Sequence, residues 1–533
     1  MPTDCISFRN TAYVSKLICD YVENRAELKS LYNRFPTIEN FKAQLEAKQS
    51  TFSSDKRAVL VKTLTAQYSQ FQTTALTTKV IKSLENKNTF TVTTGHQLNL
   101  MGGPLYFLYK IISTINLAKT LKSTYPQQNF VPVFWMATED HDFDEINHFN
   151  FQNKRFQWTQ NTSGAVGRLS TSNLTEFIEV FSKALGNSSH ALELKTLITN
   201  AYTTTTNLAD ATRFLVHTLF GSDGLLCIDG DDSSLKRLCI PHIKSELTHQ
   251  KSFNYVSTTN KCLKAIDDSY KPQVNPRELN LFYLKDNLRE RIIKKEATFS
   301  VLNTSLSWDL SGILEELDAH PERFSPNVIL RPLYQETILP NLCYIGGGGE
   351  LSYWLQLKSY FDSEQLQFPI LLHRNSVLLI SKKQQQKLEK LKLSVSDILL
   401  DKQSLMNSQL KKIAALPIDF SIQKQHLAQQ FKYLYTLANQ TDKSFLGAVS
   451  AQEKKQIKGL KILEKRLQKA EKKMHKDYLN RLEALHLVLF PNGSLQERFT
   501  NFSEFYMDHG DELIKRLKLE LDPLNQKFHV LTL

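Results

Sequence analysis

Long hydrophobic runs are absent from this 533-residue sequence. None approaches the ~18 consecutive apolar residues that a membrane-spanning helix needs, and the opening residues, MPTDCISFRN, lack the basic region and apolar core of a secretory signal. Cysteine is also sparse. The six cysteines are scattered and form no C-x-x-C pair, which argues against a disulfide framework and against a zinc knuckle. We therefore expect a cytoplasmic protein that makes no membrane contact and keeps its thiols reduced.

Most of the chain has no excess of either charge, although the formal net charge is +12. Residues 377–490 contain 22 lysines and arginines against 10 acidic residues, and the remaining 44 basic and 44 acidic residues cancel. The lysine-rich solvated face of long helices explains this excess better than a nucleic-acid site does, so we expect no nucleic-acid partner. A non-enzymatic coiled-coil protein that binds nucleic acid is the alternative, because a basic stripe is the electrostatic footprint of such proteins.

Glycine nearly disappears after Ser376, and lysine, glutamine and leucine dominate instead. This shift divides the chain into a core (1–376), a helical coiled-coil arm (377–490) and a C-terminal segment that returns to the core (491–533). In the arm, an amphipathic helix is expected to begin with Leu388, Leu391, Val395 and Ile398, and Pro417 is expected to end or kink that part of the arm. A seven-residue apolar repeat marks a later helix. The repeat comprises Leu460, Leu463, Leu467, Ala470 and Met474, and after a four-residue stutter it continues through Tyr478, Leu482, Leu485 and Leu489.

The apolar seam of this repeat is too long to be left in water. Two long helices separated by a turn-containing segment predict an antiparallel hairpin. We expect its seam to mediate homodimerisation. The alternative is that the hairpin buries the seam within a single chain.

The core begins with the order strand, glycine turn, helix, strand. The first strand, Thr89–Thr94, is followed by an apolar-periodic helix, Leu105–Leu121, and a continuously apolar strand, Val131–Ala137. Continuous apolarity is typical of a strand covered on both faces. Further strands are expected at Leu225–Asp229, Val328–Leu330, Leu342–Ile345 and Pro369–Leu372, a helical run at Leu235–Leu247, and insertions at about 149–200 and 252–324. The fold class is therefore α/β with a mostly parallel sheet, in which ligands bind beyond the carboxyl ends of the strands.

Glycines and polar residues follow the first strand, where a turn leads into the helix. The candidate residues there are Gly95, His96, Gln97, Gly102 and Gly103. Backbone N–H groups at the start of a helix suit a phosphate or a carboxylate. The layout is similar to the histidine loop of class I synthetase-like nucleotide binders, but here there is one histidine and the spacing differs. A plain strand-to-helix turn is the alternative.

An acidic cluster follows the second strand. Its candidate residues are Asp140, His141, Asp142, Glu145 and His148. Such side chains can remove protons, bind an ammonium group or ligate a metal. The structural alternative is a solvated loop with an aspartate that caps a helix. No zinc-ligand spacing accompanies the cluster, so we predict no metal.

A third group of candidate residues lies nearer the end of the core. It comprises Arg331, Gln335, Glu336, Gly346, Gly347, Gly348, Gly349, Glu350 and Tyr353. Four consecutive glycines permit positive φ and favour an anion-binding nest, whereas a flexible connection to the next helix is the alternative. Arg374 and Ser376 follow the Phe368–Leu372 strand. Arg374 suits a bidentate carboxylate, or else a salt bridge that closes the end of the sheet.

These segments carry a family resemblance. It rests on TGHQLNLMGGPLYFLYKIIS, VPVFWMATEDHDFDEINH, ILRPLYQETILPNLCYIGGGGELSYW and LQERFTNFSEFY. Together they resemble the bacillithiol biosynthesis cysteine-adding enzyme family, from Leu31–Pro36 to the C-terminus. The resemblance implies a Rossmann-like core with inserted segments, a coiled-coil arm and a homodimer. It also implies an enzyme that joins cysteine to the amino group of glucosaminyl malate, giving the thiol bacillithiol.

This chain departs from the family pattern in two places. Family members often carry a proline within the glycine run, where this chain has Gly348 or Gly349, and the family's Pro-Arg-x-Ser motif begins with His373 here. The first departure weakens any argument for a rigid glycine loop. Arg374 and Ser376 match the motif.

The resemblance and the residue types together suggest roles for the candidate residues. We expect His96 and Gln97 to contact an activating phosphate or a developing oxyanion. Candidates for amine recognition and proton removal are Asp140, His141, Asp142 and Glu145. Candidates to clamp carboxylates are Arg331, Arg374 and the Gly346–Gly349 loop. A free carboxylate is a poor acyl donor, so activation by ATP is expected, although the sequence has no Walker motif. The alternative activity is that of a nucleotidyl-transferring enzyme of the synthetase-like superfamily.

Overall fold

The computed structural model describes residues 4–71, 73–414 and 419–533. These residues divide into two compact units. The first unit is built mainly from Tyr13–Leu379 and Leu495–Leu531, and the second mainly from Ile380–Ser494. Pro417, which was expected to end or kink the first part of the arm, lies outside the described residues.

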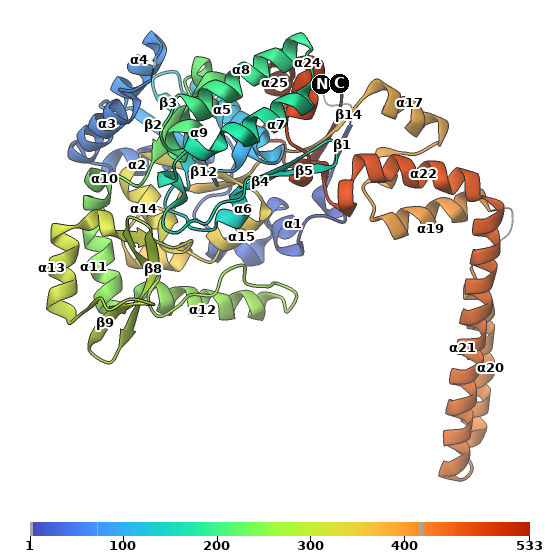
Figure 1. Cartoon of the computed structure of the whole chain (residues 1–533). Helices are drawn as coiled ribbons and strands as arrows, with labels where there is room; N and C mark the ends of the chain where they lie inside the picture. Colours follow the sequence, from blue (N-terminus) through green and yellow to red (C-terminus); the bar gives the residue numbers. More distant parts are fainter. Residues whose placement is uncertain (1–3, 72, 415–418) are drawn as a thin grey trace. The chain divides into compact units, whose positions relative to one another are not determined.

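A five-stranded parallel sheet forms the centre of the first unit (Figure 1). In spatial order its strands are β13 (Ile370–His373), β12 (Asn341–Gly346), β2 (Thr89–His96), β3 (Asn129–Met136) and β6 (Leu226–Asp229). Every neighbouring pair in this order runs parallel. The predicted α/β class with a Rossmann-like parallel core is therefore confirmed.

The strands are buried because helices cover both faces of the sheet. All eight residues of β2 are buried. Helix α5 (Tyr106–Thr124) packs on β2 and β3, and helix α2 (Asn40–Thr51) packs on β12. Side chains of a strand alternate between its two faces, so that Leu371 of β13 joins one hydrophobic cluster while its neighbours in the strand join another. Other helices of this unit are α1 (Lys16–Val22), α3 (Ser54–Tyr68), α4 (Ala75–Ser83), α9 (Leu208–Phe220), α16 (Lys358–Ser363), α24 (Ser503–His509) and α25 (Asp511–Glu520).

The order of the strands creates a crevice at one edge of the sheet. From β2 the chain continues to β3 and β6 on one side, and later returns to β12 and β13 on the other side. Ligands in doubly wound sheets bind where the strand order changes direction, beyond the carboxyl ends of the strands. Here that position lies between the ends of β2 and β12, at His96 and Gly346.

Two local predictions were wrong. Val328–Leu330 is not a strand, because Asn327 accepts hydrogen bonds from the backbone N–H groups of Ile329 and Leu330 and so starts helix α14 (Leu330–Ile338). The single helical run Leu235–Leu247 is two helices, α10 (Ser233–Arg237) and α11 (Ile240–His249). A proline in the first turn of α11 fits the start of a helix but not its interior.

The two segments predicted as insertions have their own secondary structure. The first contains a hairpin of β4 (His148–Phe151) and β5 (Lys154–Gln157), followed by α7 (Thr175–Leu185) and α8 (Ser189–Thr203). The second begins with helix α12 (Lys251–Ile266) and continues into an antiparallel sheet. In spatial order that sheet contains β10 (Ser307–Trp308), β9 (Thr298–Val301), β8 (Leu288–Lys295), β7 (Leu281–Lys285) and β11 (Phe324–Pro326).

The second unit is helical. Its elements are α17 (Lys382–Lys390), α18 (Val395–Ile398), α19 (Lys402–Ile413), α20 (Ser421–Ala438), α21 (Lys443–Met474) and α22 (Lys476–Leu489). The predicted single helix over Leu388–Ile398 is wrong, because the chain leaves α17 through Lys392 at positive φ, and Ser394 caps α18. The predicted stutter coincides with a break at His475, between α21 and α22.

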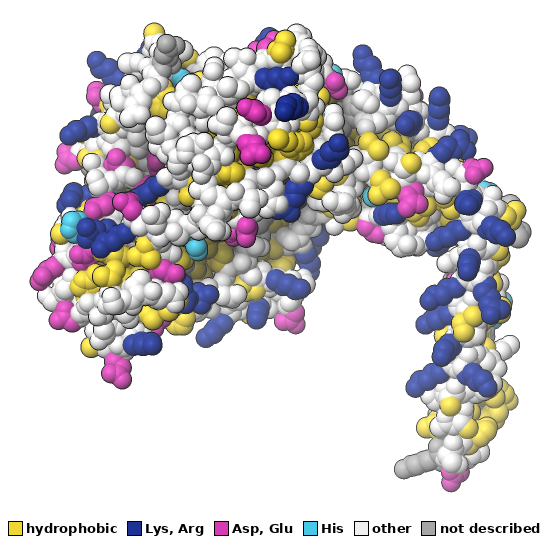
Figure 2. Space-filling model, in the orientation of Figure 1, with side chains coloured by type: hydrophobic (Ala, Val, Ile, Leu, Met, Phe, Trp, Pro, Cys, Tyr) yellow, Lys and Arg dark blue, Asp and Glu magenta, His cyan; other side chains and the backbone are white. Residues whose placement is uncertain are grey.

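Helices α20 and α21 lie side by side as a hairpin (Figure 1). Leu460, at the start of the heptad repeat, packs against the apolar side chains that α20 and α21 bury between them. Other members stay outside, because Leu463 is 53% exposed and Met474 is 75% exposed. Lysine and arginine side chains line the same hairpin (Figure 2). The hairpin thus buries part of the predicted seam within one chain and leaves part of it in solvent.

Candidate active site

A cleft of about 670 Å³ opens at the carboxyl ends of β2, β3 and β12. The predicted residues that line it are Gly95, His96, Gln97, Asp140, His141, Glu145, Arg331, Gly347, Gly349, Glu350, Tyr353 and Arg374. These residues come from separate parts of the sequence. They meet because the carboxyl ends of parallel strands lie at one edge of the sheet.

Carboxylates and an amide form the acidic wall of the cleft. Gln97 donates to Asp140 through its Nε2, 2.6 Å from Oδ2, and the same nitrogen lies 3.5 Å from a carboxylate oxygen of Glu145. Burial raises the pKa of Asp140, but the hydrogen bond from the backbone N–H of His141, the charge of Arg289 and the hydrogen bond from Gln97 outweigh that effect and hold this pKa well below its usual range. Asp140 is therefore a permanent anion.

Glu145 differs from Asp140 in its surroundings. Burial, and then the nearby carboxylates of Asp140 and Asp142, raise the pKa of Glu145 above its ordinary value. Within the described part of the chain, Glu145 makes no ion pair. A carboxylate with a raised pKa and no bound cation is suited to accept a proton.

His96 is buried at the back of the cleft among aromatic rings. Its ring faces those of Tyr106 and Phe107 at centroid distances of 5.2 and 5.7 Å. Burial, and then the charge of Lys110, lower the pKa of His96 to about 3, so the ring is neutral at pH 7. Nε2 lies 3.3 Å from the carbonyl oxygen of Gly102 and must carry the proton, because a carbonyl only accepts. The remaining ring nitrogen is an acceptor, which does not suit the expected contact with an oxyanion.

A buried polar network links the ends of β2 and β12. Lys110 of α5 donates to the carbonyl oxygen of Gly95 at 2.6 Å and lies 2.7 Å from a carboxylate oxygen of Glu350. The hydroxyl of Tyr344 donates to the other oxygen of Glu350 at 2.6 Å. Burial raises the pKa of Glu350, but the charge of Lys110 outweighs it and the pKa falls to about 2. Gly95 fits this network because a side chain there would begin 3.3 Å from the Tyr344 hydroxyl.

Arg331 extends this network into the cleft. Its Nη2 lies 2.6 Å from the hydroxyl oxygen of Tyr353, and its Nη1 donates to the amide oxygen of Gln335 at 3.1 Å. No described carboxylate lies within ion-pair distance of its guanidinium. Arg331 therefore keeps charge available for an anionic ligand.

Arg374 also lines the cleft, but its guanidinium already has a partner. It donates two parallel hydrogen bonds to Glu497, at 2.8 and 3.1 Å, and both side chains are buried. Nη1 also donates to the hydroxyl of Ser376 at 3.3 Å. The pair has the geometry of the structural salt bridge that was the alternative to a substrate clamp. Ser376 is buried beside this pair and does not line the cleft.

The glycine run does not form the predicted nest. None of the four glycines has positive φ, because they end β12 and begin helix α15 (Gly348–Trp354). The N–H of Gly347 donates to Glu350 at 2.9 Å, so the side chain of the helix itself satisfies this donor. Gly347 and Gly349 line the cleft, whereas Gly346 and Gly348 do not.

The other predicted residues lie outside the cleft and have structural contacts. Asp142 caps helix α6 (Phe143–Ile146), which is the alternative weighed for it, and His148 contacts Asn147. Gly102 and Gly103 have positive φ in the turn after β2. Gln335 and Glu336 are buried. Glu336 lies near the start of β12, where it accepts a hydrogen bond from Asn341 and pairs with Lys48 at 3.7 Å.

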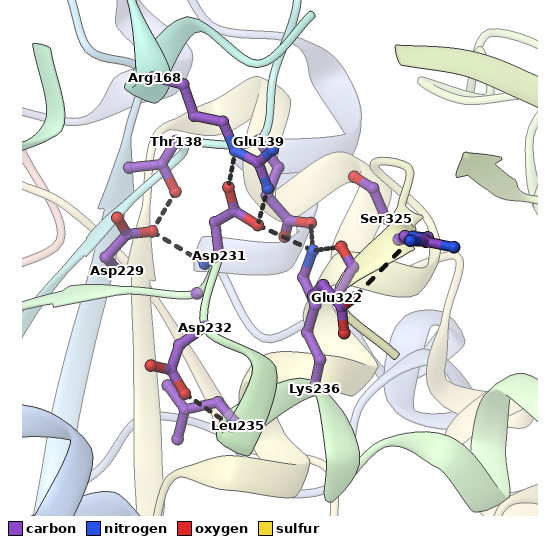
Figure 3. A network of polar contacts seen from close by, with 12 residues as sticks. Thr138, Glu139, Arg168, Asp229, Asp231, Asp232, Leu235, Lys236, Glu322 and Ser325 are labelled. Carbon is purple, nitrogen blue, oxygen red and sulfur yellow. Dashed lines mark hydrogen bonds and ion pairs between the residues drawn. The ribbon is translucent and has the colours of Figure 1, made fainter. Parts of the chain in front are cut away.

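A second charged network includes Glu139, a residue of the cleft wall (Figure 3). Lys236 of α10 is buried between two carboxylates, 2.6 Å from Glu139 and 3.0 Å from Asp231. Burial lowers the pKa of Lys236, but the charges of these two carboxylates outweigh burial and raise it. Arg168 pairs with Asp231 from the other side at 2.7 Å. Glu139 itself lines the cleft, so this network fixes one of its walls.

Several lining residues escaped prediction from the sequence. The second sheet contributes Arg289 and Arg291, and the segment before it contributes Arg277. Their sequence neighbourhood shows only an alternating strand pattern, which carries no signal for a ligand site. Lys110 did leave a signal, because it is a single lysine inside the apolar helix segment YFLYKIIS. A lysine on a buried helix face needs a partner.

Two general properties complete the site. In residues 4–71, 73–414 and 419–533, no group of three or more His, Cys, Asp or Glu side chains is arranged to hold a metal ion. Within the same residues, no helix has both the length and the apolar character needed to cross a bilayer.

Comparisons with known proteins agree with this architecture. The family model for the N-terminal Rossmann-like domain of bacillithiol biosynthesis BshC matches residues 1–375, and the model for its C-terminal coiled-coil domain matches residues 377–533. Among relatives named "Putative cysteine ligase BshC", that of Flavobacterium johnsoniae is 56% identical over 533 residues and covers all of both chains. That of Cytophaga hutchinsonii is 36% identical over 97% of this chain and 96% of its own length. That of Bacillus mycoides is 28% identical over 97% of this chain and 98% of its own length. The resemblance seen in the motifs is thus confirmed, and the chain belongs to the BshC family of bacillithiol biosynthesis.

Proposed function

We propose that this protein is a cysteine ligase that joins the carboxyl group of cysteine to the amino group of glucosaminyl malate, forming bacillithiol. Family membership and the names of the relatives support a ligase of this pathway. The observation that carries the finer proposal is the division of charge in the cleft. Carboxylates line one wall, at Asp140 and Glu145. Other walls carry arginines that have no carboxylate partner among the described residues, at Arg277, Arg291 and Arg331.

The acidic wall fits an amine nucleophile. An amino group arrives at pH 7 mainly as an ammonium ion, which a carboxylate binds through a charged hydrogen bond. Asp140 is the permanent anion for that contact. Glu145 has the raised pKa that favours proton transfer, and Gln97 holds the two carboxylates together.

The bound ammonium ion first loses one proton to Glu145, which frees the lone pair of the nitrogen. The amine nitrogen then attacks the activated carbonyl carbon of cysteine, a C–N bond forms and the C–O bond to the leaving group breaks. The second proton leaves nitrogen as the amide forms and is taken up by the departing phosphate group. Activation of the cysteine carboxylate needs a cosubstrate, and we propose ATP, which would supply an acyl phosphate or an adenylate. The residue that fits its phosphates is Arg331, whose guanidinium has no carboxylate partner in the described part of the chain.

The direct test supplies the purified protein with cysteine, glucosaminyl malate and ATP, and follows bacillithiol by mass spectrometry. The expected result is a product that requires all three compounds and is lost in Glu145→Gln. Absence of product at substrate saturation would overturn the proposal. Transfer of a labelled nucleotide to a small molecule without amide formation would establish the nucleotidyl-transferring alternative instead.

A further inference from the structure

We infer that the segment around the β7–β8 hairpin binds the malyl carboxylates of the acceptor, with Arg277 and Arg291 as the recognising residues. This inference rests on the proposed function and adds the location of one half of one substrate. The hairpin belongs to the antiparallel sheet, which the sequence marked only as an insertion. Its residues nevertheless form one wall of the cleft.

The two arginines of β8 face the cleft together. Arg289 and Arg291 are two positions apart in the strand, so their side chains leave the same face. Phe282 of β7 is the cross-strand partner of Arg291, and the guanidinium of Arg289 stacks 4.0 Å from the centre of its ring. The pleat of the hairpin therefore directs both arginines and Phe282 towards one side.

Arg289 is fully engaged within the protein. It donates to the Nδ1 of His141 at 2.6 Å, to the hydroxyl of Ser325 at 3.2 Å and to the carbonyl oxygen of Pro326 at 3.3 Å. It also lies 3.6 Å from Asp140. These contacts hold the hairpin against the acidic wall.

Arg277 and Arg291 are different. Both line the cleft, and in the described ranges only their backbone atoms form hydrogen bonds, so neither guanidinium has a hydrogen bond or an ion pair there. A guanidinium binds a carboxylate through two parallel hydrogen bonds. Two such arginines match the two carboxylates of a malyl group.

The chemistry of the acceptor explains why these arginines lie beside the acidic wall. In glucosaminyl malate, the amino group and the malyl group occupy adjacent carbons of the sugar ring. Whatever binds the malyl group must therefore lie close to whatever binds the amine. The contacts from Arg289 to Asp140 and His141 place the hairpin next to the carboxylates assigned to the amine.

The first experiment measures steady-state kinetics of Arg277→Gln, Arg291→Gln and Lys295→Gln. Lys295 lies on the same strand outside the cleft, so its variant controls for loss of one positive charge. We expect each arginine variant to raise the KM for glucosaminyl malate about 10- to 100-fold, the effect of losing a charged hydrogen bond. The KM values for cysteine and ATP, and the kinetics of Lys295→Gln, should stay near wild type. A rise in the KM for ATP alone would overturn the inference.

A second experiment uses an acceptor substrate that lacks the carboxylates, instead of a protein that lacks the arginines. Methyl glucosaminide retains the amine but has no malyl group, so wild-type protein should use it poorly and the arginine variants should use it as well as wild type does. If the arginine variants lose the same activity, relative to wild type, with both acceptors, the arginines act on something other than the malyl group.

Direct binding separates this inference from the proposed reaction. Calorimetry with malate alone should show binding to the wild-type protein and to Lys295→Gln, and weaker binding to Arg291→Gln. If no amide product forms but malate binding follows this pattern, the proposed function fails and the carboxylate subsite stands. If the product forms but malate binds all three proteins equally, the subsite fails and the proposed function stands.

Discussion

The pair between Arg374 and Glu497 makes the sharpest prediction, because two roles for Arg374 lead to opposite results. If the arginine is a structural partner, Arg374→Met removes the one cation among the described residues that is bonded to the carboxylate of Glu497, which is 1% exposed. Glu497 also accepts the backbone N–H of Val377 at 3.0 Å, so it cannot turn away into solvent. The substitution leaves a buried, unpaired charge.

The magnitude follows from that geometry. Removing one partner of a buried, hydrogen-bonded ion pair costs about 3–5 kcal/mol of the free energy of unfolding. The double variant Arg374→Met with Glu497→Leu removes both charges and should be more stable than Arg374→Met alone. Arg155→Met is the matched control. It removes an exposed arginine, and it should change the free energy of unfolding by no more than about 0.5 kcal/mol.

The assay is urea unfolding followed by tryptophan fluorescence. All four tryptophans lie in the first unit, at 135, 158, 308 and 354, so the signal reports the unit that contains the ion pair. If Arg374→Met unfolds like the wild type but its KM for glucosaminyl malate rises strongly, the structural reasoning is refuted. Arg374 would then be the substrate clamp that its sequence motif suggested.

Three further predictions concern other parts of the molecule. Glu145→Gln should lower kcat by about 10²–10⁴-fold in the product assay, the usual effect of losing a general base. Because the pKa of Glu145 is raised, wild-type activity should fall on acidification at a pH above the ordinary glutamate pKa. Near-normal turnover in the variant would exclude this role. Burial raises the pKa of Glu336 to about 7 despite the nearby charge of Lys48. The contribution of its neutral form to the free energy of unfolding is therefore complete below about pH 4.5 and is lost as pH rises through about 7. In urea unfolding across this range, Glu336→Gln should not show that loss of stability. Leu463 is an exposed member of the heptad repeat, so Leu463→Glu should convert a homodimer to a monomer in light scattering. Gln456→Glu adds the same charge to the same helix and should leave the dimer intact. A wild-type protein that is already monomeric contradicts the prediction.

The sequence by itself determined the α/β class and part of the candidate site. The continuously apolar run at Val131–Ala137 predicts a strand covered on both faces, and the structure has β3 there. His96 and Asp142, which follow two predicted core strands, were expected to project into a shared crevice. His96 and the neighbouring Asp140 line one cleft, whereas Asp142 caps α6 outside it. Local patterns suffice for such inferences because parallel strands end at the same edge of the sheet.

Only the tertiary structure decided which charges are free to bind a ligand. Arg374 and Arg291 look alike in the sequence, since each is an arginine next to a strand or within one. Arg374 is occupied by Glu497, a residue 123 positions later, whereas Arg291 faces the cleft without a partner in the described part of the chain. Periodicity in a sequence records which face of an element is buried, but it does not record which distant side chain completes an ion pair. That pairing depends on how the elements pack, and it separates a structural arginine from one that can recognise a substrate.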